Sequence, residues 1–138
     1  MKTHQYELID EKVFEHEFDN GLKLFVIPKP GFQKTYVTYT TQFGSLDNHF
    51  KPIGSQQFVE VPDGVAHFLE HKLFEKEDED LFTAFAEENA QANAFTSFDR
   101  TSYLFSATSN IESNIKRLLN MVETPYFTEE TVNKEKGI

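Results

Sequence analysis

The sequence predicts an α+β fold in which a mostly antiparallel sheet packs against helices. Short runs rich in β-branched and aromatic residues, separated by turn residues, fill the first third of the chain and recur near residue 95. Other segments instead carry apolar residues at helical spacing, which is typical of helices with one buried face. Strands and helices in one short chain indicate a sheet that packs against helices.

The first predicted elements are the two strands of a hairpin, over residues 13–18 and 22–27. Asn20 and Gly21 lie between them, and this pair supplies the two positive φ angles of a type I′ turn. A third strand, over residues 34–43, is rich in threonine and tyrosine. We expect these three strands to form one sheet.

Residues 46–62 are expected to form a long loop or a small extra hairpin before the first helix. The segment either borders a site or elaborates the surface, and we favour the surface elaboration. His49 within it is a further candidate metal ligand, ranked below the motif described next. His16, in the first strand, is expected at the sheet surface and not on a metal.

A pair of histidines four residues apart marks the clearest candidate site, His67-Phe-Leu-Glu-His71, in which Glu70 is the glutamate. On a helix these three residues share one face, because 3.6 residues complete a turn. Neutral imidazole nitrogens suit Zn²⁺, and a carboxylate beside a zinc-bound water can accept its proton. The motif therefore predicts metal-assisted hydrolysis, with His67 and His71 as ligands and Glu70 as general base.

The alternative interpretation is an amphipathic helix whose histidines fall at helical spacing by chance. Asp63 is expected to cap this helix at its N-terminus. Val65, Leu69 and Leu73 lie opposite the histidines on the helical wheel and are expected to face the core. Both faces then have a use, which favours the metal site.

A second helix is predicted to begin at Asp78 or Asp80, which are both good N-cap residues, and to end near Asn89, a residue that tolerates the left-handed cap conformation. Two strands, over residues 93–98 and 102–107, are expected to follow it. The expected buried stripe of the second helix comprises Leu81, Phe82, Phe85 and Ala86.

A third helix is predicted over residues 111–122, with Pro125 just past its end. Five apolar residues at helical spacing are expected to face the core: Ile111, Ile115, Leu118, Leu119 and Val122. Thr128 is expected to cap a last helix, which carries Glu135.

Composition limits the possible functions. The 138 residues are 38% hydrophobic and 14% aromatic, which predicts one folded domain with a core. A net charge of −10 without a basic run argues against binding to nucleic acid or to an anionic membrane. The chain has no cysteine, which excludes disulfides and thiol catalysis and fits a reducing, cytoplasmic location. We expect no signal peptide and no membrane span.

The inverted His-x-x-Glu-His motif is that of the inverzincins, and the sequence resembles the pitrilysin and insulinase family, whose relatives include the mitochondrial processing peptidases. The segments that carry the resemblance are Asn20 to Leu22, Phe43 to Ser45, Gly64 to His71, Asn93 to Thr96, Arg100 to Tyr103, and Val132 to Ile138. The chain departs from the family at Ala90-Gln91-Ala92, where a glycine usually precedes the Asn-Ala pair. The resemblance implies a processing-peptidase-like metallohydrolase fold.

The resemblance also implies a third metal ligand, a glutamate that would fall a few residues past Ile138. Residues 1–138 are therefore expected to be the truncated, N-terminal part of a zinc peptidase domain and to have little or no activity alone. Glu135 is implied to support the metal by contacting a ligand. A subsidiary hypothesis makes Glu135 a substitute third ligand.

For substrate, the resemblance implies a peptide or protein that pairs with the strand over residues 93–98, an exposed sheet edge. Ala94 would leave the approach clear and Asn93 would hold polar groups of the substrate. Phe95 or Phe74 would line a side-chain pocket, with core packing as the alternative for both. A second peptidase half or a partner subunit is the implied protein partner.

Two other functions remain open at this level. A ribosylhomocysteine lyase has a similar fold and motif, but its chemistry uses cysteine, which this chain lacks. A non-catalytic binding or assembly subunit of the same fold is the stronger alternative. Such subunits usually lose ligand or base residues, whereas His67, Glu70 and His71 are all present.

Overall fold

The computed structural model describes residues 1–136, which divide into two compact units with a boundary between Gln33 and Lys34. The first unit is a small sheet, and the second contains the rest of the strands and the four α-helices. Across the described residues, none of the helices has the length and apolar character needed to cross a bilayer.

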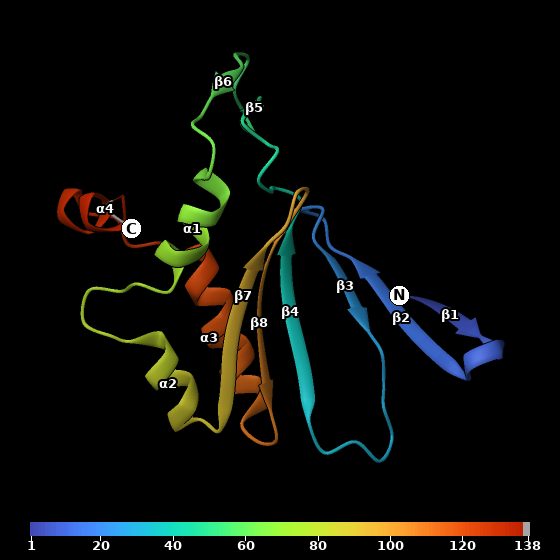
Figure 1. Ribbon diagram of the computed structural model, residues 1–138. Helices are drawn as coiled ribbons and strands as arrows, with labels where there is room; N and C mark the ends of the chain where they lie inside the picture. Colours follow the sequence, from blue (N-terminus) through green and yellow to red (C-terminus); the bar gives the residue numbers. More distant parts are fainter. Residues whose placement is uncertain (137–138) are drawn as a thin grey trace. The chain divides into compact units, whose positions relative to one another are not determined.

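The first unit is an antiparallel sheet in the order β1-β2-β3 (Figure 1), with bounds β1 Lys2–Tyr6, β2 Glu11–Glu17 and β3 Lys23–Val26, and a short 3₁₀ helix, η1, over Glu7–Ile9. None of its residues, 1 to 33, is buried. Strand β1 was missed, and the expected third strand belongs to another sheet. The reason is that Lys-Thr-His-Gln-Tyr has no apolar alternation to mark it as a strand.

The turn between β2 and β3 is not the expected type I′ turn. Gly21 has φ +86°, whereas Asn20 does not have a positive φ. The N–H of Gly21 instead donates to the carbonyl of Phe18, and the Asn20 side-chain oxygen accepts from the N–H of Leu22 at 3.1 Å. An asparagine that bonds forward along the backbone forms a local turn of its own, which explains the longer loop.

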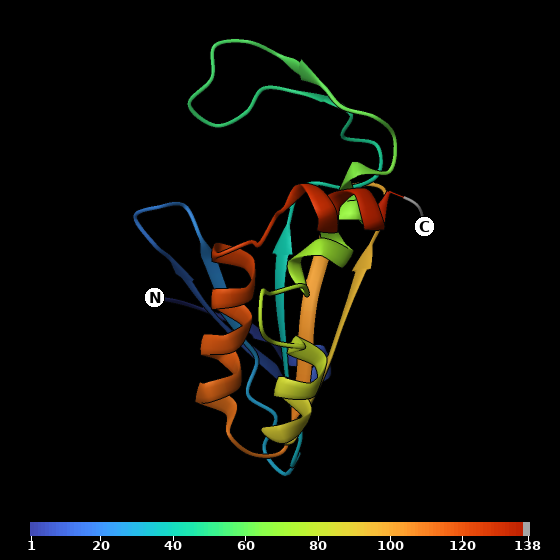
Figure 2. The same ribbon diagram turned by 90° about the vertical axis from the view of Figure 1, so that its left-hand side faces the viewer.

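The second unit is built on an antiparallel sheet in the order β4-β8-β7. Its main elements are β4 Thr35–Thr41, α1 Val65–Leu73, α2 Leu81–Glu87, β7 Ala90–Thr96, β8 Thr101–Ala107, α3 Ile111–Glu123 and α4 Glu129–Glu135. Helices α1, α2 and α3 lie on one face of this sheet (Figures 1 and 2). The core between them contains Leu81, Phe85, Ala90, Tyr103, Phe105, Ala107, Leu118 and Met121.

Helix α2 begins at the predicted cap, since the Asp80 carboxylate accepts from the N–H of Phe82 at 3.1 Å. Its buried face is partly different from the expected one: Ala84 is buried, whereas Phe82 and Ala86 are exposed. Phe82 instead stacks on Phe74, with ring centroids 4.4 Å apart. The predicted left-handed Asn89 has φ +57°.

Helix α3 buries Asn114 and Met121, which the apolar pattern did not select, and leaves Ile115 36% exposed. The Asn114 amide group donates to the carbonyls of Glu88 and Asn110, so hydrogen bonds offset the cost of its burial. At α4 the predicted cap is confirmed, because the Thr128 hydroxyl accepts from the N–H of Thr131.

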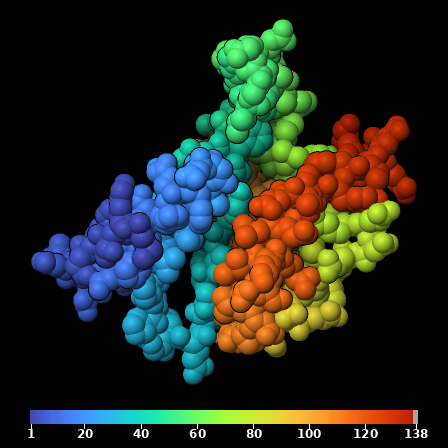
Figure 3. Space-filling model, turned by 180° about the vertical axis from the view of Figure 1, so that it is seen from behind, coloured from blue at the N-terminus to red at the C-terminus, as the bar shows by residue number. Residues whose placement is uncertain are grey.

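The segment before α1 forms the expected small hairpin, with β5 His49–Phe50 and β6 Val59–Glu60. In Figure 3 it extends, in green, away from the rest of the second unit. Its His49 ring stacks on Phe58 at 4.9 Å. Asp63 does not cap α1: its carboxylate accepts from the Asn48 side chain at the base of the hairpin, and Gly64 is the N-cap residue.

Gly44 brings the start of this hairpin segment against the turn between β7 and β8. A Cβ atom at Gly44 would lie 2.5–2.6 Å from backbone atoms of residues 98–100, so any side chain would force the two segments apart. Two hydrogen bonds fix the same approach, from the N–H of Ser45 to the carbonyl of Ser97 and from the Thr101 hydroxyl to the carbonyl of Phe43. This explains why the chain carries glycine at this position.

Candidate metal centre

The motif lies on α1 with its three polar residues on one face, as predicted. The imidazole rings of His67 and His71 have centroids 4.5 Å apart and an interplanar angle of 79°, and both residues are exposed. The opposite face packs inward, where Ala66 is buried and Leu73 packs against the core. One helix thus presents two adjacent imidazoles to solvent from a fixed support.

His71 has a carboxylate partner from α4. Its Nδ1 lies 2.5 Å from Oε1 of Glu135, whose side chain is only 13% exposed. Because a carboxylate accepts and does not donate, this hydrogen bond places the proton on Nδ1. Nε2 of His71 is then the nitrogen with a free lone pair, which is the form of histidine that binds a metal.

Glu70 is held by the sheet. The Thr96 hydroxyl, at the end of β7, donates to Oε2 of Glu70 at 2.6 Å. The same carboxylate affects Tyr103, which is buried on β8. Burial raises the pKa of the Tyr103 phenol, and the negative charge of Glu70 raises it further. The carboxylate therefore has one oxygen fixed by Thr96, and its charge lies close enough to Tyr103 to disfavour a phenolate there.

The residues present fit part of a zinc site. Two neutral imidazoles on one helix face are a common zinc ligand pair, and the contact with Glu135 prepares one of them. Within residues 1–136, no three histidine, aspartate or glutamate side chains are arranged to hold a metal ion. Glu135 contacts Nδ1 of His71, so in this arrangement it lies beside a candidate ligand and not in the position of a ligand.

The three predicted substrate residues lie on β7, which is an edge strand of the β4-β8-β7 sheet. Ala94 packs toward the core on the helix side, as Thr96 does two residues later. Alternation along a strand therefore directs Asn93 and Phe95 to the other face. The Asn93 side-chain oxygen accepts from the N–H of Ala94, and Phe95 is 45% exposed.

Phe74, the other predicted pocket residue, follows α1 and packs inward. Its ring stacks on Phe82 and lies 6.2 Å from the ring of Tyr103, centroid to centroid. It is one of the partly buried residues against the core. The structure thus brings together His67, Glu70 and His71, whereas Phe74 and Ala94 pack against the core and Phe95 is exposed on the other face of β7.

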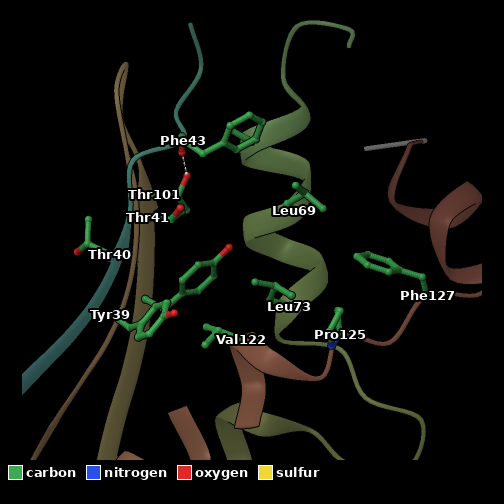
Figure 4. Close-up of a pocket in the computed structure, with 12 residues that line it drawn as sticks. Tyr39, Thr40, Thr41, Phe43, Leu69, Leu73, Thr101, Val122, Pro125 and Phe127 are labelled. Carbon is green, nitrogen blue, oxygen red and sulfur yellow. Dashed lines mark hydrogen bonds between the residues drawn. The ribbon is translucent and has the colours of Figure 1, made fainter. Parts of the chain in front are cut away.

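A cavity of about 420 Å³ lies behind α1, between the helix and the sheet (Figure 4). Leu69 and Leu73 of α1 line it, and these residues lie on the side of the helix opposite the histidines. Ala66 of α1 lines it as well. The remaining walls come from β4 and the segment after it, β8, α3 and the α3–α4 connection, through Tyr39, Thr40, Thr41, Phe43, Thr101, Tyr103, Val122, Pro125 and Phe127. It is therefore a feature separate from the motif face.

Thr96 and Lys72 were not selected from the sequence as site residues. Thr96 had a usable signal, because it lies two residues after Ala94 and must share its face of β7. Lys72 had none: it follows His71 directly and resembles a solvent-exposed helix residue, yet its side chain is fully buried. Neither contact can be derived without knowing how α1 crosses the sheet.

Comparison with known proteins identifies the family. The insulinase family, peptidase family M16, matches residues 52–138. The chain belongs to this family. It is 56% identical over 138 residues to a Bacillus subtilis protein named uncharacterized zinc protease YmfH. This match covers all of this chain and 32% of that relative. Human insulin-degrading enzyme is 30% identical over 129 residues, which cover 86% of this chain and 11% of the enzyme.

Solved structures agree with this assignment. An M16-like peptidase from Alicyclobacillus acidocaldarius superposes with a TM-score of 0.85 at 41% identity, over 92% of this chain and 30% of that structure. A Helicobacter pylori protease, at 21% identity and a TM-score of 0.76, supports the fold alone. The predicted family and α+β fold are thus confirmed. The chain spans about a third of the length of YmfH.

Proposed function

We propose that this chain contributes the ligand helix and general base of a zinc endopeptidase. The observation that carries the proposal is the motif face of α1, on which His67 and His71 lie 4.5 Å apart, ring to ring, beside Glu70. Membership of a peptidase family and the name of the YmfH relative support it. Bound zinc would supply Lewis-acid activation of a water and of the peptide carbonyl.

Each residue of the motif face has a separate role in this proposal. His67 and His71 bind the metal, and Glu135 keeps the proton of His71 on Nδ1 so that Nε2 faces outward. Glu70 accepts the proton of the attacking water. The hydroxyl of Thr96 holds one oxygen of Glu70 and leaves the other free for this transfer.

The third ligand is proposed to be a glutamate beyond Ile138, as the family resemblance implies. Residues 1–138 alone should then bind zinc weakly and hydrolyse peptides poorly, if at all, because catalytic zinc sites use three protein ligands. The subsidiary hypothesis that Glu135 replaces this ligand requires it to leave Nδ1 of His71. An unchanged zinc affinity in Glu135→Gln would exclude that replacement.

The proposed substrate is an extended peptide that adds to the edge of β7. The backbone around Ala94 lies on this edge and next to Thr96, which contacts the general base. Strand addition gives affinity through main-chain hydrogen bonds and places little demand on sequence. Asn93 and Phe95 would contact substrate from the far face of the strand, and a second peptidase half or partner subunit would complete the site.

The test compares two variants in a form of the protein that continues past Ile138 to the third ligand. Glu70→Gln should retain zinc and lose about 100-fold or more in peptidase rate, because only the general base is removed. His67→Ala should lose both zinc and activity. Full peptidase activity in Glu70→Gln would refute the proposal. Stable pairing with another subunit, without metal, would instead favour the non-catalytic function.

A further inference from the structure

Lys72 is a fully buried lysine directly after the metal-ligand candidate His71. Removing an ammonium ion from water is costly unless partners compensate for the lost hydration. Burial lowers the pKa of Lys72, and the negative charge of Glu135 acts in the opposite direction. The contacts that offset this desolvation cost therefore indicate which segments Lys72 holds in position.

The contacts of Lys72 reach three parts of the second unit. Its ammonium group forms an ion pair with Glu75, after the end of α1. It lies 6.0 Å from the ring centroid of Phe127, in the connection between α3 and α4. The negative charge of Glu135, the last residue of α4, also acts on this ammonium group and raises its pKa, against the larger lowering by burial. One buried charge thus links α1 to the connection and to α4.

Lys76 makes a second link to the same connection. Its ammonium group donates to the carbonyl and the hydroxyl of Thr124, and to the carbonyl of Met121 at 3.5 Å. These carbonyls end α3 and lack partners within the helix. Lys76 therefore holds the start of the α3–α4 connection, and Lys72 lies against Phe127 near its end.

Helix α4 needs these links because it has little else to hold it. It is seven residues long, over Glu129–Glu135, and none of these residues is buried. A helix of this length is unstable in water without tertiary contacts. Yet its last residue, Glu135, approaches His71 to 2.5 Å. The connection that leads into α4 therefore supports that contact, beside the direct packing of α4 on α1.

We propose that Lys72 is a positioning residue, whose buried ammonium group fixes the α3–α4 connection and α4 against α1 so that Glu135 remains on Nδ1 of His71. Its connection to catalysis rests on the proposed zinc-peptidase function. The positioning itself is a property of the protein without metal. Lys72 touches neither metal nor substrate and acts through Glu135 alone.

The first readout is the protonation of the His71 ring in the metal-free chain, measured by ¹⁵N NMR. The unsubstituted chain should show the proton on Nδ1. Lys72→Met, which keeps most of the length of the side chain without the charge, should shift His71 toward a mixture of tautomers, and Glu135→Ala should do the same. Lys116→Met, on the exposed face of α3, is the matched control and should leave His71 unchanged. An unshifted His71 in folded Lys72→Met would overturn the proposal.

The second readout is a double-mutant cycle of zinc affinity. Lys72→Met and Glu135→Ala should each weaken zinc binding by about 10-fold, and the double variant by no more than about 10-fold, because both remove the same support of His71. Losses that multiply would mean that Lys72 acts elsewhere and would refute the proposal. The cycle uses the form that continues past Ile138 to the third ligand. If that form fails to bind zinc without any substitution, the proposed function fails, while the His71 tautomer still decides the role of Lys72.

A further variant covers the case in which Lys72→Met does not fold. Phe127 is 46% exposed, so Phe127→Ala removes the aromatic partner of Lys72 with little loss of core packing. It should loosen the same connection and lower zinc affinity by about 3-fold, with a detectable change in the His71 tautomer. An unaltered tautomer and affinity in Phe127→Ala would then count against the proposal.

Discussion

The two faces of α1 are held in place by different means. The inner face is packed: Ala66 is buried and Leu73 lies against the core formed with α3 and the sheet. The outer face is exposed and is held by polar contacts from distant segments, with Thr96 of β7 on Glu70 and Glu135 of α4 on His71. The support of the helix and the arrangement of the polar residues on its outer face are therefore separable.

The largest expected effect comes from removing a proposed zinc ligand from the outer face. His67→Ala should weaken zinc binding by more than about 100-fold in a form that carries the third ligand, which exceeds the usual loss from a residue that only supports a ligand. The free energy of unfolding without metal should change by less than about 0.5 kcal/mol, because His67 is exposed. Calorimetric zinc titration and urea unfolding measure the two quantities. A large loss of metal-free stability would show that the faces are not separable.

A substitution on the inner face should have the opposite profile. Leu73→Ala removes a partly buried side chain against the core and should lower the free energy of unfolding by about 2 kcal/mol. Zinc affinity, measured at a temperature where the variant is folded, should remain within about 2-fold. A loss of zinc affinity comparable to that of His67→Ala would contradict this prediction.

Removing the contact on the general base should affect rate alone. Thr96→Val keeps the shape of the side chain and deletes the hydroxyl that donates to Glu70. Hydrogen bonds to charged groups are worth about 1.5–3 kcal/mol, so we expect a loss of about 10-fold or more in kcat with zinc affinity unchanged. The measurement is peptide hydrolysis by the longer form at saturating zinc, with Thr38→Val as a control on another strand. Unaltered kcat would mean that Thr96 does not position Glu70.

The smallest effect is expected at a helix end away from the motif. The Thr83 hydroxyl, and then backbone N–H groups of the first turn of α2, hold the pKa of Asp80 below its ordinary value of 3.8. Asp80 therefore contributes stability that is present above that ordinary value and is lost as the pH falls through the lower, folded-state value. Asp80→Asn should flatten the stability profile in this acidic range, measured by urea unfolding. An unchanged profile would show that the cap is not charge-dependent.

Local patterns in the sequence were sufficient for much of the fold. Helical spacing located α1 and α3, the caps Asp80 and Thr128 were correct, and a run rich in threonine and tyrosine located β4. The strand expected over residues 93–98 is shifted, since β7 spans Ala90–Thr96. The motif face of α1 followed from the spacing of its histidines alone. These features depend on residues close together in the chain, where backbone geometry is decided locally.

The errors occurred where contacts between distant segments decide the outcome. The pairing of β4 with β8 replaced the expected sheet, because strand partners are not encoded in a single run. Asp63 does not cap α1, because its carboxylate accepts a hydrogen bond from the Asn48 side chain instead. The contacts of Thr96 and Lys72 could likewise not be predicted, because they depend on how α1 crosses the sheet and on where the chain places α4.

The most direct test of the zinc site is the zinc affinity of the 138-residue chain beside a form extended through the next acidic residues, each with a His67→Ala control. We expect weak zinc binding by the 138-residue chain and tight binding by the extended form, with the tight binding abolished by His67→Ala. Absence of zinc binding in both forms, or tight binding that survives His67→Ala, would contradict it.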